Sequence, residues 1–212
     1  MKKKRQKTGL PPGSVIYTGN QKMEKVVIHY LQFDSEQISE SKLDNHEKIA
    51  IQPPSEDQVD WYDIRGLHDT GLIELIGKTF NIHPLIMEDV ADIYQRPKFD
   101  EYQQGNFISV RALQFDKESL KVRTEQVSIY FRNGLLVSFQ ENETDLFEVV
   151  RQRLKSGRGK IRQRGADYLA YALMDTLVDN YLLVLDDIEE IMESLEEELI
   201  SDPSNSNKER LH

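Results

Sequence analysis

Residues 122–140 read VRTEQVSIYFRNGLLVSFQ and contain two runs rich in β-branched and aromatic residues. The runs are separated by Arg132-Asn133-Gly134. Asn-Gly favours a tight hairpin turn, because both central residues of such a turn take positive φ angles. Residues 122–131 and 135–140 are therefore predicted to be antiparallel neighbours in a β-sheet.

Further strands and two short helices are predicted before this hairpin. Asp69 or Thr70 can cap a helix whose apolar residues have helical spacing. His83-Pro84 opens a second helix, and Arg96-Pro97 is expected to end it. Short runs of β-formers predict strands at residues 24–34, 48–52, 60–66 and 106–116.

Two helices are predicted after the hairpin, a short one at residues 145–155 and a long one at residues 166–200. In the short helix, the residues expected to point inward are Phe147, Val149, Val150 and Leu154. In the long helix, apolar residues recur at steps of three and four: Leu173, Leu177, Tyr181, Leu185, Ile188, Met192, Leu195 and Leu199.

These elements together predict the fold class. It is α/β, with a mixed parallel/antiparallel sheet sandwiched by helices and followed by a long C-terminal helical arm. The predicted division is an α/β domain over residues 1–165, with a basic N-terminal arm over residues 1–14, and a long acidic helical arm over residues 166–212.

Composition excludes several classes of function. The 212-residue chain has 37 acidic and 27 basic residues, a formal net charge of −10 and no cysteine. The acidic balance argues against nucleic-acid binding, and the lack of cysteine excludes disulfides and Cys-ligated zinc. No apolar run approaches 18 residues, so no membrane span is expected. We predict no enzyme, because glycine-rich phosphate loops, G-x-S-x-G and H-E-x-x-H motifs are absent.

Charge is segregated in the C-terminal third of the chain. Residues 151–164 carry basic residues and no acid, whereas residues 179–200 carry acidic residues and no base. Like charges one helical turn apart cost about 0.2–0.5 kcal/mol per pair. The acidic stretch is therefore either a solvated face or a face opposed by something positive, such as the basic stretch or cations from solution.

Carboxylates are the candidate metal ligands. Glu88 and Asp89 are adjacent on the second short helix, and Asp175 and Asp179 are one turn apart on the long helix. Carboxylates without Cys or paired His suit Mg²⁺ or Ca²⁺ better than Zn²⁺. The alternative interpretation is that these acids cap helices or lie on the surface.

A set of short motifs occurs in order along nearly the whole chain and resembles the cytoplasmic part of CorA-type magnesium and cobalt channels. The motifs are Gly9-Leu-Pro-Pro-Gly13, Val15-Ile-Tyr-Thr-Gly19, His83-Pro-Leu-Ile-Met-Glu-Asp89, Gln95-Arg-Pro-Lys98, Glu125-Gln-Val-Ser128 and residues 162–175. Each motif alone is weak, but their order along the chain is specific.

This resemblance implies the cytosolic divalent-cation-sensing domain of a homopentameric magnesium/cobalt channel. In that family, regulatory Mg²⁺, and by extension Co²⁺, is bound between neighbouring subunits and favours a closed arrangement. The corresponding acids here are Glu88, Asp89 and Asp175. The expected location is the cytoplasmic face of the cell membrane, with this part of the chain soluble.

Other family features do not occur in these residues. The stalk helix, the two transmembrane helices and the Gly-Met-Asn signature are absent, so the chain is expected to end before the stalk. Two alternatives stay open. One is the same domain of a zinc-transporting relative, and the other is a non-transport module that binds partners through its acidic arm.

Overall fold

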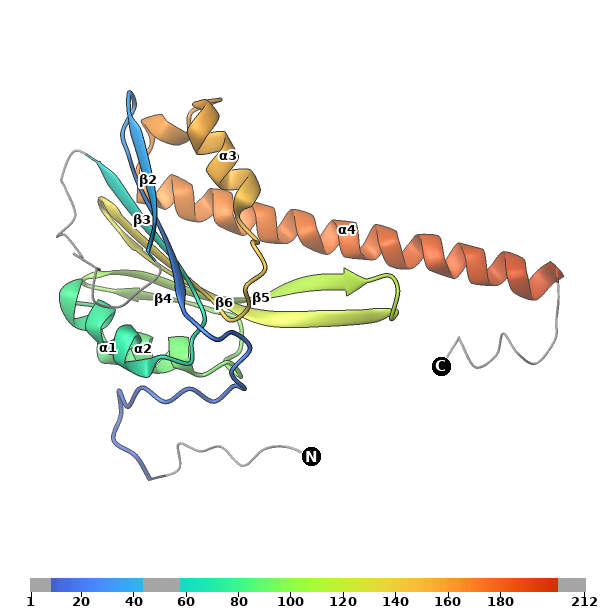
Figure 1. Ribbon diagram of the computed structural model, residues 1–212, viewed down its shortest axis with the longest axis horizontal. Helices are drawn as coiled ribbons and strands as arrows, with labels where there is room; N and C mark the ends of the chain where they lie inside the picture. Colours follow the sequence, from blue (N-terminus) through green and yellow to red (C-terminus); the bar gives the residue numbers. More distant parts are fainter. Residues whose placement is uncertain (1–8, 44–57, 202–212) are drawn as a thin grey trace.

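The computed structural model describes residues 9–43 and 58–201 of the chain. Within these ranges the strands form one seven-stranded sheet in the order β2-β1-β3-β7-β6-β5-β4 (Figure 1). The strands are β1 (Val27–Phe33), β2 (Ile38–Leu43), β3 (Val59–Arg65), β4 (Lys98–Tyr102), β5 (Gly105–Asp116), β6 (Lys121–Arg132) and β7 (Leu135–Gln140). Only β3 and β7 pair in parallel, which confirms the predicted mixed sheet.

The predicted strands in the centre of the sheet are confirmed, and two edge strands were missed. Edge strands β2 and β4 have the sequences ISESKL and KFDEY. Charged and hydroxyl side chains there interrupt the run of β-branched and aromatic residues from which a strand is predicted. They pair on one side only, and their described side chains are at least partly exposed, so charged and hydroxyl residues are tolerated there. The strand predicted at residues 48–52 lies outside the described residues.

The β6–β7 hairpin is confirmed, with Arg132 opposite Leu135 and Asn133-Gly134 as its loop. Gly134 takes a positive φ of 73°, but Asn133 does not, so the expectation of positive φ at both positions was wrong. One glycine in the left-handed region is enough to reverse the chain here.

Helices α1 (Thr70–Thr79) and α2 (Pro84–Ala91) cover one face of the sheet (Figure 1). As predicted, Asp69 caps α1, because its carboxylate accepts a hydrogen bond from the Leu72 N–H at 2.9 Å. His83 caps α2 through Nδ1, and Pro84 occupies the first turn. Helix α2 ends at Ala91 with Asp92 as its cap, before Arg96-Pro97 as predicted.

Helices α3 (Glu148–Ser156) and α4 (Ala166–Ser201), together with the short 3₁₀ helix η2 (Ile161–Gln163), cover the opposite face. The predicted sandwich is therefore confirmed. Phe147, Val150 and Leu154 pack inward as expected, but Val149 is 63% exposed.

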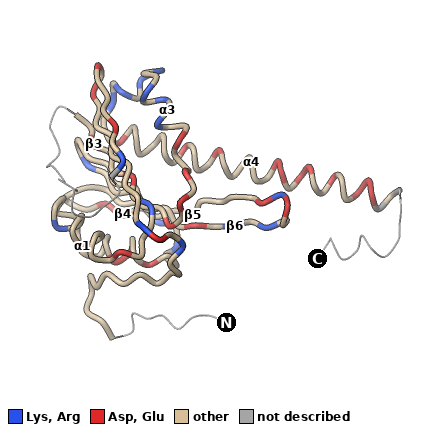
Figure 2. Tube along the Cα trace, viewed as in Figure 1, with Lys and Arg blue, Asp and Glu red and all other residues tan. Residues whose placement is uncertain are grey.

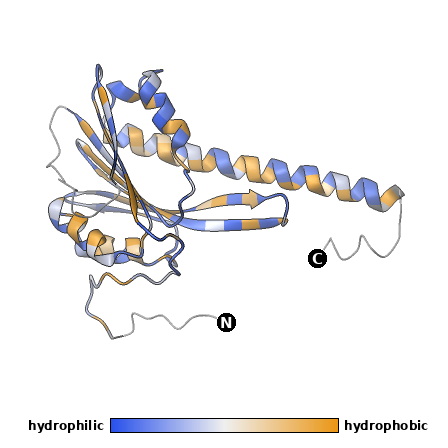
Figure 3. Cartoon of the chain, in the orientation of Figure 1, coloured by the Kyte–Doolittle hydropathy of each residue, from blue (hydrophilic) through white to orange (hydrophobic). Residues whose placement is uncertain are grey.

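The first part of α4 belongs to the core, and its second part extends past the sheet beside the β5–β6 hairpin (Figure 1). Apolar and polar residues alternate along it (Figure 3). Leu173, Leu177 and Leu195 are buried as predicted. Leu185 and Met192 belong to the same apolar series but are exposed, whereas Val184, outside the series, is buried. The side chain of Leu199 lies outside the described part.

By length and composition alone, α4 over Ala166–Glu198 is the one helix in the described ranges that could cross a membrane. The sequence analysis did not predict this candidate span, because it considered only uninterrupted runs of apolar residues. Leu169, Leu173 and Leu177 are buried against the sheet, so this part of α4 is a core helix.

Candidate functional site

Two of the predicted metal ligands, Glu88 and Asp89, lie side by side in the last turn of α2. The carbonyl end of a helix carries partial negative charge, so acidic side chains are unfavourable there. The last turn of α2 contains no basic residue that would offset them. Positive charge from another part of the structure is therefore favourable at this end of the helix.

Both carboxylate oxygens of Asp89 are engaged within the chain. Oδ1 accepts a hydrogen bond from Nε2 of Gln95 at 2.6 Å, and Oδ2 accepts one from Nζ of Lys98 at 2.7 Å. Lys98 also contacts Asp100 at 2.6 Å. Burial lowers the pKa of Lys98, but its hydrogen bonds to Asp100 and Asp89 outweigh this and raise that pKa above its usual value. Lys98 is therefore a charged partner of Asp89 at neutral pH.

Glu88 is held by the N-terminal segment that packs along α2. Its Oε2 accepts a hydrogen bond from the Gly13 N–H at 2.7 Å. Gly13 has a φ of +84°, and a Cβ at this position would lie 2.9 Å from Cβ of Pro84. Glycine is required here because any side chain would push the backbone N–H away from the Glu88 carboxylate.

Asp175 is exposed on α4, on the opposite face of the sheet from α2. The described residues contain no group of three or more His, Cys, Asp or Glu side chains that could hold a metal ion. One copy of the chain therefore does not bring Glu88, Asp89 and Asp175 together.

Lys117, at the tip of the β5–β6 hairpin, provides positive charge to the acidic stretch of α4. Its Nζ lies 2.8 Å from Asp187 and 3.1 Å from Glu190. The basic stretch at residues 151–164, considered as an alternative partner, gathers around α3 and the start of α4 (Figure 2). There Lys155 pairs with Glu40 at 2.7 Å.

A buried ionic network, which sequence reasoning missed, joins β3 to α3. Asp63 is fully buried and accepts hydrogen bonds from Arg151 at 3.0 Å and from Ser138 at 2.7 Å. Arg65 and Gln140 donate to the same carboxylate. Two acids and an arginine in a strand whose other residues are apolar or aromatic were a signal that could have pointed to this network.

Sequence reasoning also missed a pair of buried acids near the end of the β6–β7 hairpin. Glu125 Oε2 accepts a hydrogen bond from the Asn142 N–H at 3.0 Å, whereas its Oε1 is buried and has no hydrogen-bond partner in the described ranges. Burial, with a smaller contribution from the neighbouring Glu141, raises the pKa of Glu125 to about 7, against the lowering effect of the Asn142 hydrogen bond. Glu141 itself pairs with Lys22 at 2.8 Å.

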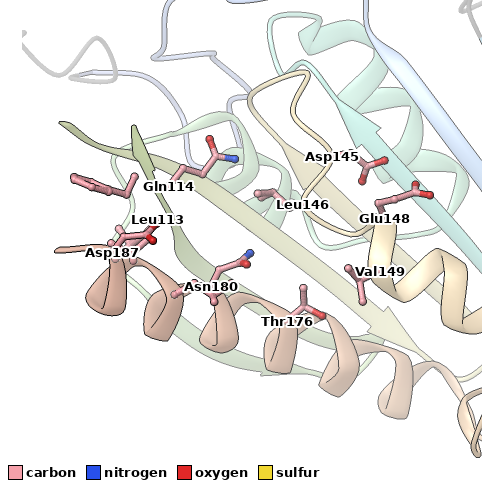
Figure 4. Close-up of a pocket in the computed structure, with 12 residues that line it drawn as sticks. Leu113, Gln114, Asp145, Leu146, Glu148, Val149, Thr176, Asn180 and Asp187 are labelled. Atoms are coloured by element: carbon pink, nitrogen blue, oxygen red, sulfur yellow. The ribbon is translucent and has the colours of Figure 1, made fainter. Parts of the chain in front are cut away.

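Two cavities open on the surface near these elements. Glu125 lines one of about 460 Å³, together with other polar residues that include Lys22 and Asn142. The second is an open groove of about 370 Å³ between α4, α3 and β5 (Figure 4). Asp187 and Glu148 contribute acidic side chains to its lining. Neither cavity contains Glu88, Asp89 or Asp175.

Comparison with known proteins identifies the family. The family described as CorA-like Mg²⁺ transporter protein matches residues 56–211. The chain is 36% identical over 206 residues, or 97% of its length, to the cobalt/magnesium transport protein CorA of Thermotoga maritima. It spans 58% of the length of that relative.

Solved structures share the fold. The soluble domain of CorA from Methanocaldococcus jannaschii matches 85% of this chain and 68% of its own length, with a TM-score of 0.64 and 19% identity. The ZntB cytoplasmic domain from Vibrio parahaemolyticus matches 81% of this chain and 65% of its own length, with a TM-score of 0.55 and 17% identity. Since the sequence match covers most of the chain and the fold agrees, this chain belongs to the CorA-like Mg²⁺ transporter protein family.

Proposed function

We propose that this chain is the cytosolic divalent-cation-sensing part of a magnesium/cobalt transporter, in which Mg²⁺ bound between adjoining copies stabilises a closed assembly. Its ligands are Glu88 and Asp89 from one copy and Asp175 from a neighbour. The 36% identity to a cobalt/magnesium transport protein over 97% of the chain supports this assignment. The chain is not an enzyme in this proposal, and it acts at the cytoplasmic face of the cell membrane.

The placement of the three carboxylates carries the proposal that the site is shared. Glu88 and Asp89 lie on the α2 face of the sheet, and Asp175 is exposed on the α4 face. A site containing all three therefore needs a second copy of the chain. The donors are carboxylate oxygens, which fit Mg²⁺ and Co²⁺ as hard or borderline cations and leave room for bound water.

The energetics favour several sites acting together. A cation present at its dissociation constant stabilises the state that binds it by only about 0.4 kcal/mol. Five symmetric sites would contribute about 2 kcal/mol, which is within the usual range of allosteric coupling. In a homopentamer, weak binding at five sites therefore adds up to enough free energy to shift the equilibrium toward the closed assembly.

We expect MgCl₂ or CoCl₂ to raise the melting temperature of the chain by about 5–10 °C at a concentration one hundred times the dissociation constant. NaCl at equal ionic strength should not have this effect, because a monovalent ion cannot bridge two carboxylates as strongly. Asp89→Asn and Asp175→Asn should each remove most of the shift. Asp179→Asn is the matched control, since it removes the same charge one turn further along α4.

Mixing the two variants tests whether the site is shared. An equimolar mixture of Asp89→Asn and Asp175→Asn chains contains interfaces in which an intact Asp89 meets an intact Asp175. We expect the mixture to recover part of the metal-induced shift and of the metal-induced self-association measured by sedimentation velocity. Full retention of the shift in Asp89→Asn, or no recovery in the mixture, would contradict the shared site.

Two alternatives give different results in the same assays. The ZntB domain is less similar in fold, with a TM-score of 0.55 against 0.64 for the CorA soluble domain. A zinc-selective relative should respond to Zn²⁺ at concentrations where Mg²⁺ has no effect. A non-transport interaction module that uses its acidic arm should lose partner binding in Asp187 and Glu190 variants while Asp89→Asn has no effect.

A further inference from the structure

The carboxyl-terminal end of α2 concentrates negative charge. Asp89 lies in the last turn, Asp92 caps the helix, and Asp100 on β4 lies close by, since Lys98 contacts both Asp89 and Asp100. The backbone carbonyls at this end add partial negative charge. Such a concentration of negative charge is stabilised by a positive group next to it.

Lys98 is that positive group, and it is held in place from several sides. It is the first residue of β4 and lies opposite Ser109 of β5. Its ammonium nitrogen is 5.6 Å from the centre of the Phe107 ring, 2.7 Å from Asp89 and 2.6 Å from Asp100. The side chain of Lys98 is 31% exposed and that of Asp89 is 13% exposed. The ammonium group thus occupies one of the positions at which a cation could bind to Asp89.

We propose that Lys98 is an internal counter-cation that a divalent ion must displace from Asp89, and that it sets the cation concentration at which the site fills. This inference rests on the proposed function, because it concerns the same site. The Lys98 ammonium contacts Oδ2 of Asp89 and Gln95 contacts Oδ1, so a metal ion approaching either oxygen meets a hydrogen-bond donor, and at Oδ2 that donor carries a positive charge that repels the ion.

The exchange also favours divalent over monovalent ions. A monovalent cation that replaces the ammonium group leaves the local charge unchanged, so it gains little electrostatic energy. A divalent ion adds one positive charge next to Asp89, Asp92 and Asp100, and it is therefore favoured. Lys98 thus makes the site discriminate by charge even though its ligands are ordinary carboxylates.

Lys98→Met tests this role, because it removes the ammonium group and keeps an unbranched side chain. Isothermal titration with MgCl₂ should show about fivefold tighter binding in this variant than in the wild-type chain, the upper end of what a partly exposed ion pair contributes. Magnesium binding should also become more sensitive to added NaCl. Lys98→Arg, which keeps the charge, should bind Mg²⁺ within about twofold of wild type by the same reasoning.

Lys78→Met is the matched control for the loss of one positive charge. Lys78 lies on α1, on the same face of the sheet, and its only described ion pair is a 3.9 Å contact with Glu74. Because Lys78 is well exposed, its removal should change magnesium affinity less than about twofold. Circular dichroism of each variant checks that the fold is retained.

The outcomes separate this inference from the proposed function. If magnesium binding depends on Asp89 but Lys98→Met binds no more tightly than Lys78→Met, Lys98 is not a competitor and the inference is wrong. If the wild-type chain binds no magnesium, or if Asp89→Asn binds it as well as the wild-type chain does, the proposed function itself is wrong. In the wild-type chain, the NMR signal of the Lys98 ammonium group should shift as MgCl₂ is added, and an unchanged signal at saturation would mean that the ion does not displace it.

Discussion

Replacing Asp63 by alanine is expected to lower the free energy of unfolding by about 3–5 kcal/mol. Asp63 is fully buried and is the shared partner of Arg65 and Arg151, of which Arg151 is only 1% exposed. Removing the carboxylate leaves two guanidinium groups close together in the interior, and burial already lowers the pKa of Arg151. Asp145 still pairs with both arginines, but its carboxylate is 28% exposed, so the desolvation of these charges is then only partly compensated.

Urea denaturation at pH 7 measures this loss directly. Asp63→Asn provides a milder second variant, because it removes the charge but keeps a hydrogen-bonding group of the same size. Glu40→Ala is the control, since Glu40 also links the sheet to α3 through Lys155 but both partners are partly exposed. It should cost about 1 kcal/mol or less. Equal losses in Asp63→Ala and Glu40→Ala would show that the buried network has no special role in stability.

Replacing Glu125 by glutamine is expected to stabilise the chain at alkaline pH and to have little effect at acidic pH. Burial raises the pKa of Glu125 from 4.5 to about 7, so the folded chain binds this proton more tightly than the unfolded chain. Between these two values the folded state carries the extra proton, and the free energy of unfolding therefore falls as pH rises. The loss attributable to Glu125 is on the order of 3 kcal/mol above pH 7.

Thermal and urea unfolding at pH 4, 6 and 8 test this dependence. Glutamine resembles the protonated acid, so the difference between Glu125→Gln and wild type should be near zero at pH 4 and largest at pH 8. Glu118→Gln serves as the control, because Glu118 lies exposed in the turn of the neighbouring β5–β6 hairpin. A wild-type chain with the same pH dependence as Glu125→Gln would show that Glu125 titrates normally.

The elements of the core followed from local patterns. The β6–β7 hairpin, the Asp69 cap and the His83-Pro84 helix start depend on residues close together in sequence, and all three are confirmed. Edge strands β2 and β4 did not follow, because their side chains are mostly polar and their pairing depends on β1 and β5. The face of α4 was predicted only in part, since the buried stripe is decided by the sheet beneath it.

The sequence predicted which residues belong to the candidate site, but not which other residues surround them. Glu88, Asp89 and Asp175 stand out as carboxylates on helices, and their common role stays a prediction. Their surroundings were not predictable, because Gly13, which binds Glu88, is 75 residues away. The same holds for the hydrogen bond from the Asn142 N–H to the buried Glu125, which joins β6 to the segment that follows β7.

The amino-acid sequence by itself determined the order and type of most elements, the absence of thiol chemistry and the supply of hard oxygen ligands. These properties depend on composition and on spacing over a few residues. Only the tertiary structure decided which charges meet: Lys98 with Asp89, Lys117 with Glu190 and Arg151 with Asp63, over separations of 9, 73 and 88 residues. The physical reason is that electrostatic energy depends on distance and on exposure to water, and both are set by the folded chain.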